Sequence, residues 1–576
     1  MDHASTGTLG AAVSTRYDSG DAVTCPALQQ LLQGAVAQLQ NEGVVERREH
    51  TFWVQRVPAK MRAQHGDFWS NAALVLAAEG EASTRKSAGE LARCIIERIE
   101  WSGSVQEANG RINFQLDESA IARGVARAVE EREHYGASDA LAGTRVVVEF
   151  VSAEPSGPLP FTAARSAAMG DALCRILALQ GASVTREYYL NDAESSSRMR
   201  LLGESVAAIY LSSFGHESEP PEGAMDDAFV RGVAQGIASR EGNAYLLMPE
   251  SERAALFARK ALDAIVTAQK ATLRDFGVRF DVWTSEQALR DEGRVTASLQ
   301  KLRERGHLYE RDGAEWLRTT TFGDNADRTV VRTNGKPTYL ATDIAYHGFK
   351  LERGFDRLIN IWSAEHRQYI ARTRAALLAG GCDADKVEVI PCENSRWLRE
   401  GAPVRRGAGG GVFTMDEALR AVGRDTLRFL LVRRGWDDIV DIDAETARRD
   451  DETNPAYAAR LVPARLSTLI REAEARAGSG TVGTIEYSQW SEAEQSVARL
   501  VALWPDVALG AATRRAPQEV AQFVSELAAG VRDIVKTAQP NNDTAINAVR
   551  LPLLQAARVV AANALQALGV DAATKL

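Results

Sequence analysis

The sequence predicts an α/β protein whose centre is a parallel, doubly wound sheet, with a small α+β domain before it and an all-α domain after it. Between residues 142 and 445, strands rich in β-branched residues alternate with amphipathic helices. Before this region short strands and helices mix, and after about residue 445 the strands stop. A chain of 576 residues is too long for one hydrophobic core, so several domains are expected.

The N-terminal domain is predicted over residues 27–141. The stretches ALQQLLQGAVAQL and SAGELARCIIERI have helical periodicity, whereas REHTFWVQRV and GRINFQL have the character of strands. Residues 1–26 are rich in Ser, Thr, Gly and Ala and contain no signal-peptide core, so they are expected to form a disordered leader.

The central region, residues 142–445, begins with the strand VVVEF and a turn that contains Pro155, Gly157 and Pro158. A helix through Met169 and Leu177 follows. Such a strand, turn and helix N-terminus form a common nucleotide-binding entrance in α/β proteins, yet this turn has no Lys, His or Gly-x-Gly pattern to hold a phosphate. Further strands are predicted at SVTREYYL, RFDVW, RLINIW and KVEVIPC, with a helical insertion at about 195–275.

The C-terminal region, residues 446–576, has only amphipathic helices, interrupted by a predicted loop near ARAGSGTVGTIEYSQW. The predicted architecture is therefore a small N-terminal domain, a Rossmann-like centre and a helical C-terminal domain.

The composition is that of an ordinary globular enzyme, with 45% hydrophobic and 25% charged residues. Five cysteines form no CxxC pair, so neither a disulfide framework nor a zinc site is expected, and a reducing cytoplasm fits best. No apolar run reaches membrane-spanning length. The net charge of −9 gives no reason to expect DNA or membrane as a partner, although it leaves room for a local RNA-binding face.

Several stretches resemble class I arginyl-tRNA synthetases, in the same order and over residues 27–576. They are VEFVSAEPSGPL, REYYLNDA, FGVRFDVWTSE, RTNGKPTYLATDIAYH, ERGFDRLINIWSAEH, and VGRDTLRFLLVRR followed by TNPAYAARLVPAR. HGDFWSNAALVLA and GRINFQL are similar to the N-terminal domain of that family, which touches the tRNA elbow. The resemblance implies a Rossmann-like catalytic domain and an anticodon-binding helical domain.

The first ATP-binding signature of that family, His-x-Gly-His, falls on Pro160, Phe161, Thr162 and Ala163. Both histidines and the glycine are missing. Proline and alanine side chains donate no hydrogen bond to a phosphate, and Pro160 also has no backbone N–H. Because removal of one such donor typically costs roughly 10²–10³ in rate, the loss of this signature predicts loss of ATP-dependent activation.

The second signature, a Lys-Met-Ser-Lys loop, falls on RRGAGGGVFTM. The degenerate loop comprises Arg405, Arg406, Gly407, Ala408 and Gly409, and a lysine that some family members carry before the first signature corresponds to Gly157. The glycines are interpreted either as a shortened loop without function or as an anion-binding nest beside the arginines.

The resemblance implies that the pocket for arginine is retained. The substrate-binding candidates are Glu149, Ser152, Glu154, Tyr339, Asp343, Glu365 and His366. Asp343 follows Tyr339 by four residues, so both lie on one helical face. Glu154 stands where the family usually has Asn, which makes the site less suited to an anion and still suited to a cation.

The tRNA-facing residues are only partly retained. Asn71, Asn113 and Phe114 are the tRNA-binding candidates in the N-terminal domain. In the C-terminal domain Ile534 and Val535 replace aromatic residues that contact anticodon bases in the family. Because aromatic stacking stabilises a bound base, anticodon reading is expected to be weakened.

These observations leave three hypotheses. The leading one is a paralogue that has lost ATP-dependent arginine activation but still binds arginine or another guanidine-bearing molecule and keeps a tRNA surface. Such a protein is either a pseudoenzyme or an enzyme repurposed for tailoring a tRNA-borne or guanidine-bearing substrate. The second is an active, divergent arginine–tRNA ligase that uses ATP and Mg²⁺ and holds the triphosphate through Arg165, Arg405, Arg406 and the glycine loop. The third is a non-catalytic partner subunit of a synthetase. No metal site is expected under the leading hypothesis.

Overall fold

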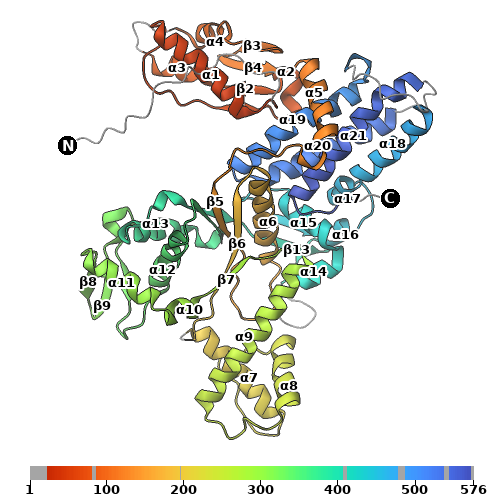
Figure 1. Cartoon of the computed structure of the whole chain (residues 1–576). Helices are drawn as coiled ribbons and strands as arrows, with labels where there is room; N and C mark the ends of the chain where they lie inside the picture. The colour runs from red at the N-terminus through yellow and green to blue at the C-terminus, as the bar shows by residue number, and fades with distance from the viewer. Residues whose placement is uncertain are drawn as a thin grey trace.

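The computed structural model describes residues 22–80, 86–194, 196–405, 412–477, 487–537 and 544–572. Figure 1 shows a central α/β part, an N-terminal α+β part above it, a helical C-terminal part to one side and a helical extension below. This agrees with the predicted fold class. Among the described helices, none combines the length and the apolar character that a membrane span requires, and all five cysteines are free thiols.

The centre of the molecule is a five-stranded sheet in the order β12-β11-β5-β6-β7, and every pairing in it is parallel. Its strands are β5 (Arg145–Glu149), β6 (Ser183–Leu190), β7 (Val282–Ser285), β11 (Arg357–Ser363) and β12 (Val387–Cys392). The chain builds β5, β6 and β7 outward in one direction and then returns to place β11 on the other side of β5. This reversal creates a topological switch point, where α/β sheets commonly bind ligands.

All five strands of this sheet were predicted. The helix predicted after the first strand is α6 (Ala163–Leu179), whose Met169, Leu173 and Leu177 are fully buried. Gly170 lets α6 pack directly on the sheet, because a Cβ at this position would lie 2.4 Å from the ring of Phe150.

The N-terminal part contains the predicted helices and strands. Its antiparallel sheet has the order β1-β2-β4-β3. The elements are α1 (Cys25–Asn41), β1 (Val54–Arg56), α2 (Arg62–His65), β2 (Phe68–Ser70), α3 (Ala72–Glu79), α4 (Ala88–Ile96), β3 (Ser104–Ala108), β4 (Arg111–Gln115) and α5 (Glu118–Glu131). Most of the predicted leader, residues 1–21, lies outside the described residues.

The predicted insertion consists of α7 (Ser197–Ser212), α8 (Ala228–Glu241) and α9 (Glu250–Asp275). These helices pack around their own cluster of buried side chains, which includes Val206, Tyr210 and Phe257, and they form the lower extension in Figure 1.

Two small sheets were not predicted. One comprises β8 (Leu308–Arg311), β9 (Ala314–Leu317) and β10 (Arg328–Val331), and the other comprises β13 (Ser395–Arg399), β14 (Ala402–Pro403) and β15 (Val440–Asp443). The helices between and after these strands are α10 (Glu286–Asp291), α11 (Arg294–Glu304), α12 (Tyr339–Glu352), α13 (Ile370–Ala379), α14 (Met415–Val422), α15 (Arg424–Val432) and α16 (Ala444–Ala447).

The C-terminal part is helical, as predicted, with β15 as the last strand among the described residues. It comprises α17 (Pro455–Arg460), α18 (Val462–Ala477), α19 (Glu492–Thr513), α20 (Pro517–Thr537) and α21 (Thr544–Ala567). Trp504 of α19 is fully buried, and its indole N–H donates to the carbonyl of Tyr135 at 2.9 Å. This bond ties the helical part to the end of the N-terminal part.

Candidate functional site

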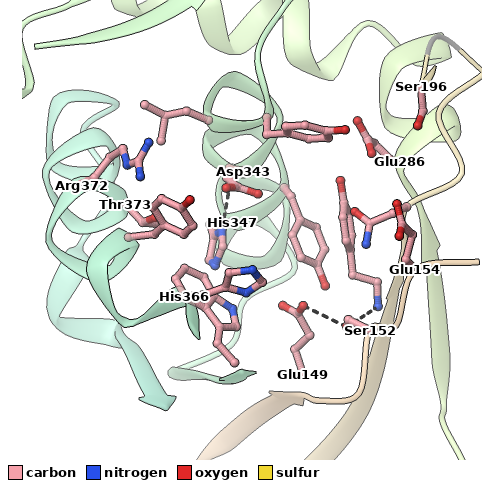
Figure 2. Close-up of a pocket in the computed structure, with 17 residues that line it drawn as sticks. Glu149, Ser152, Glu154, Ser196, Glu286, Asp343, His347, His366, Arg372 and Thr373 are labelled. Atoms are coloured by element: carbon pink, nitrogen blue, oxygen red, sulfur yellow. Dashed lines mark hydrogen bonds between the residues drawn. The ribbon is translucent and has the colours of Figure 1, made fainter. Parts of the chain in front are cut away.

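A pocket of about 590 Å³ opens at the carboxyl ends of the central strands, at the switch point of the sheet. One wall comes from β5, β6 and the turns that follow them, and the opposite wall comes from α12 and α13 (Figure 2). Its lining residues are Glu149, Ser152, Glu154, Tyr189, Asn191, Ser196, Glu286, Tyr339, Leu340, Asp343, Tyr346, His347, Trp362, His366, Tyr369, Arg372 and Thr373.

The fold brings these side chains together in two ways. Glu149 is the last residue of β5 and Glu286 directly follows β7, so the parallel strands deliver both carboxylates to one edge of the sheet. Helix α12 presents Tyr339, Asp343 and Tyr346, which recur at helical spacing and share one face.

The floor of the pocket is a buried ion pair. Lys350 Nζ donates to Glu149 Oε2 at 2.5 Å and to Asn360 Oδ1 at 2.9 Å, and Ser152 Oγ donates to Glu149 Oε1 at 3.1 Å. Burial would raise the pKa of Glu149, but Lys350 and the hydrogen bonds outweigh it and hold the pKa below its ordinary value. The charge of Glu149 is therefore already balanced by the protein.

Asp343 differs from Glu149 because no donor reaches it. Among the described residues, no side chain or backbone N–H donates to its carboxylate, while its backbone carbonyl accepts from Nδ1 of His347 at 2.8 Å. Burial, together with the negative charges of Glu149 and Glu286, raises the pKa of Asp343 to about 7. The pocket thus contains a carboxylate to which no cation of the described residues is hydrogen-bonded or ion-paired.

Two further ionisable groups of the pocket, His347 and Glu286, have partners within the protein. His347 is buried, and its two ring nitrogens meet the carbonyl of Asp343 and the amide of Asn360. Burial and the nearby Lys350 lower its pKa to about 4, so the ring is neutral at physiological pH and serves packing. Burial raises the pKa of Glu286, which accepts from Arg290 at 2.7 Å.

Glu154 lies at the rim, in the turn after β5. Its Oε2 accepts from Nε of Arg198 in α7 at 3.1 Å, and the two side chains are 46% and 53% exposed. This pair is solvated, unlike the pairs on the floor.

Six of the seven predicted substrate-binding residues line this pocket: Glu149, Ser152, Glu154, Tyr339, Asp343 and His366. Glu365 is not among the residues that line the pocket. Glu365 lies in the 3₁₀ turn after β11 (Ala364–Tyr369), where its side chain is exposed. The same turn contributes His366 to the lining of the pocket.

Sequence reasoning missed several lining residues, among them Glu286, Asn191 and Arg372, as well as Lys350 behind the wall. A signal for two of them was present. Asn191 and Glu286 each follow directly after a parallel strand, and residues in this position lie at the ligand-binding edge of such sheets.

The degenerate first signature lies outside the lining of the pocket. Phe161 is buried and packs with its ring centroid 5.5 Å from Trp397 and 5.7 Å from Phe413. Its backbone N–H donates to the carbonyl of Phe413 at 2.9 Å, and Pro160 forms a bridge with Thr414. Thr162 precedes α6 without a side-chain capping bond, and Ala163 is its first residue. None of these four side chains provides a charged group for a phosphate.

One residue that the second hypothesis assigns to binding of the triphosphate, Arg165, has a different role in the structure. Arg165 is fully buried, and its guanidinium donates to the backbone carbonyls of Glu393, Gly435 and Asp438. It is therefore a structural residue and cannot reach a bound nucleotide. Arg405 is exposed, whereas Arg406, Gly407, Ala408 and Gly409 lie outside the described residues.

The predicted tRNA-binding residues of the N-terminal part mostly have structural contacts. Phe114 is fully buried and Asn113 nearly so, and their assignment as groups that contact tRNA stays a prediction. Their burial follows from the position of β4 inside the sheet, between β2 and β3. Asn71 is half-buried, and its Oδ1 accepts from the backbone N–H of Trp53 at 2.8 Å.

In comparison with known proteins, the chain matches two family models. The model described as "tRNA synthetases class I (R), catalytic domain" matches residues 125–421, and the model described as "DALR anticodon binding domain" matches residues 461–576.

Individual relatives agree with these models. The chain is 36% identical over 524 residues to the arginine–tRNA ligase of Moorella thermoacetica, a match that covers 89% of this chain and 92% of that protein. It is 35% identical over 560 residues to the arginine–tRNA ligase of Desulforamulus reducens, covering 96% and 98%. The structure of arginyl-tRNA synthetase from Thermus thermophilus is similar in fold, with a TM-score of 0.74, 22% identity and coverage of 95% of this chain and 100% of that one.

Proposed function

The chain belongs to the arginine–tRNA ligase family of class I synthetases, and we propose that it binds arginine or an arginine-like cation in this pocket without activating it through ATP. The observation that carries the proposal is the Asp343 carboxylate. It lines the pocket, and no donor among the described residues reaches it.

A guanidinium group suits this carboxylate. It is planar, always charged, and can donate two parallel hydrogen bonds to one carboxylate. Glu149 already holds Lys350 and Glu286 already holds Arg290, so Asp343 is the acid that gains most from an added cation. The rings of Tyr189 and Tyr346 line the same space, 4.4 Å apart between centroids, and Lys350 Nζ lies 4.0 Å from the Tyr346 ring centroid, so these rings enclose the site and one of them already faces a cation.

The absence of ATP-dependent activation rests on the groups that replace the first signature. Transition-state stabilisation of phosphoryl chemistry requires preorganised donors aimed at the developing charge. Pro160 and Ala163 offer no side-chain donor, and Arg165 is committed to three backbone carbonyls.

The test combines calorimetric titration with a pyrophosphate-exchange assay. We expect arginine or its decarboxylated analogue agmatine to bind the wild-type protein, D343N to abolish binding, and E365Q to leave binding unchanged. Glu365 is a matched control because it is an exposed acid close in sequence to the pocket but outside its lining. ATP is expected to give no heat of binding and no exchange with pyrophosphate in the presence of arginine and tRNA.

An active arginine–tRNA ligase is the second candidate function. It is favoured by the 36% identity to an arginine–tRNA ligase over most of the chain, and it requires ATP and Mg²⁺ with a phosphate grip built from Arg405 and the loop after it. Pyrophosphate exchange that depends on arginine would establish this candidate and remove the first.

tRNA is the proposed macromolecular partner under both candidates. The match of residues 461–576 to the DALR anticodon binding domain supports this. Retardation of total tRNA in a native gel tests it. Because all five cysteines are free, a reducing cytoplasm is the proposed location.

A further inference from the structure

Four carboxylates line the pocket, and two of them remain open to a ligand. Glu149 and Glu286 already accept from the cations Lys350 and Arg290. Asp343, on α12, has no donor among the described residues. The fourth acid, Glu154, lies on the opposite side of the pocket, in the turn after β5 (Figure 2).

The partner that Glu154 has is a weak one. Its pair with Arg198 rests on one contact of 3.1 Å to Oε2, between two side chains that are each about half exposed. Solvated ion pairs of this kind contribute little free energy, because water screens the charges and both side chains lose rotamer freedom. The other oxygen of Glu154, Oε1, accepts nothing from the described part of the chain. A charged group of a ligand can therefore compete for Glu154.

Two acids on opposite walls favour a ligand with two positive groups. A guanidinium bound at Asp343 leaves the other end of the molecule near Glu154. An ammonium at that end is attracted, whereas a free carboxylate meets a like charge in a partly enclosed space.

We infer that Glu154 makes this pocket selective for a guanidine-bearing amine without a free carboxylate, in which the carboxyl group is absent or is bound in an amide or ester. The inference rests on the proposed function, since it assigns the substrate class of the same site.

Arg372 is the group that opposes this selectivity. It lines the pocket from α13, and its guanidinium lies 4.1 Å from the ring centroid of Tyr369. Arg372 and Glu154 lie on opposite sides of the pocket in Figure 2. If a ligand carboxylate were held by Arg372, free arginine would bind at least as well as an analogue without the carboxylate. The two arrangements thus predict opposite rank orders.

The experiment is calorimetric titration of the full chain at pH 7.5 with agmatine, arginine amide and arginine. Agmatine and arginine amide carry the guanidinium and an amine without a free carboxylate. We expect both to bind at least tenfold more tightly than arginine. In E154Q, which keeps the shape of the side chain and removes its charge, the difference should shrink to about threefold or less, because the repulsion is gone. E365Q should retain the full preference.

Three results would contradict the inference. Equal or tighter binding of arginine by the wild-type protein would overturn the assigned substrate class and leave the proposed cation site intact. A preference unchanged in E154Q would show that Glu154 does not determine it. Failure of all three compounds to bind would overturn the proposed function itself, and with it the inference.

Discussion

Lys350 donates to Glu149 across 2.5 Å at the floor of the pocket, and both side chains are closed off from solvent, with 0% and 8% exposed. The pair joins α12 to the end of β5, so the two walls of the pocket meet at a balanced charge. A ligand cation therefore does not need to neutralise Glu149. The attraction of the ligand cation is left to Asp343, which lies seven residues, or about two helical turns, before Lys350 on α12.

Replacing Lys350 by methionine is expected to destabilise the protein by about 3–5 kcal/mol, because it leaves a buried carboxylate without its cation. The midpoint of urea unfolding measures this loss. The double variant K350M/E149Q removes both charges and should recover most of it. An equal loss in the single and double variants would contradict the account of the floor as a balanced pair.

Agmatine affinity is expected to depend on the protonation of Asp343. The pKa of Asp343 is about 7, and burial is the main reason for this rise. The negative charges of Glu149 and Glu286 raise the pKa further, whereas the positive charges of Lys350 and Arg372 lower it. A cation binds the charged carboxylate, so affinity should fall by about tenfold per pH unit well below pH 7 and become constant above about pH 8. Titration calorimetry between pH 5.5 and 8.5 measures this profile, and agmatine does not change its charge in that range.

The empty protein provides the control for this assignment. A carboxyl whose pKa is raised in the folded state contributes stability that is complete below about pH 4 and is lost as pH rises through about 7. The wild-type melting temperature should therefore fall more than that of D343N between pH 5.5 and 8. His347, whose pKa falls from 6.5 to about 4 on folding, makes stability rise with pH in the lower part of this window, but this contribution is the same in both proteins and cancels in the comparison. Parallel profiles in the two proteins would assign the dependence to another group.

The sequence was sufficient to predict the central sheet because its inner strands β5 and β11 contain runs of buried, mainly apolar residues, and helical stretches separate the strands along the chain. It failed for β8, β9 and β10, whose strands are short and half-exposed, so that their residues lack a clear alternation. β14 has two residues and no periodicity at all.

The candidate site was predictable where a residue lies at a strand end or on a helix face that a motif identifies, as for Glu149 and Asp343. Which side chains pair within the site was not predictable, since Lys350 lies 201 residues from Glu149 along the chain and only the fold brings them together. The same limit explains why the structural role of Arg165 could not be predicted from the sequence. From the sequence it is a free cation near the lost signature, whereas its contacts lie more than two hundred residues away.

Arg165 is expected to act on stability and not on ligand binding. R165M removes a guanidinium that donates to three backbone carbonyls, which would then be buried without a donor, and each unsatisfied group costs about 1–3 kcal/mol. We expect a clear fall in the urea midpoint with unchanged agmatine affinity at a temperature where the variant is folded. A selective loss of nucleotide binding, without a loss of stability, would restore Arg165 to the phosphate grip.

Arg428 is expected to hold the central and C-terminal parts together. Its fully buried guanidinium donates to Asp171 of α6 at 2.6 Å, to the carbonyl of Phe276 at the end of α9 at 3.1 Å, and to the carbonyl of Leu568 after α21 at 3.0 Å. R428M removes all three contacts and leaves the buried Asp171 with fewer cations, so we expect a loss of about 3–5 kcal/mol in unfolding free energy.

The matched control for R428M is R396M, which breaks the exposed pair between Arg396 and Asp441, with side chains 51% and 41% exposed. Such a pair contributes at most about 1 kcal/mol, so this variant should unfold close to the wild type. Limited proteolysis gives a second readout, because release of Leu568 should expose the end of α21 to cleavage in R428M but not in R396M. Equal resistance of both variants would mean that other contacts hold the helical part, among them the hydrogen bond from the buried Trp504 indole to the carbonyl of Tyr135.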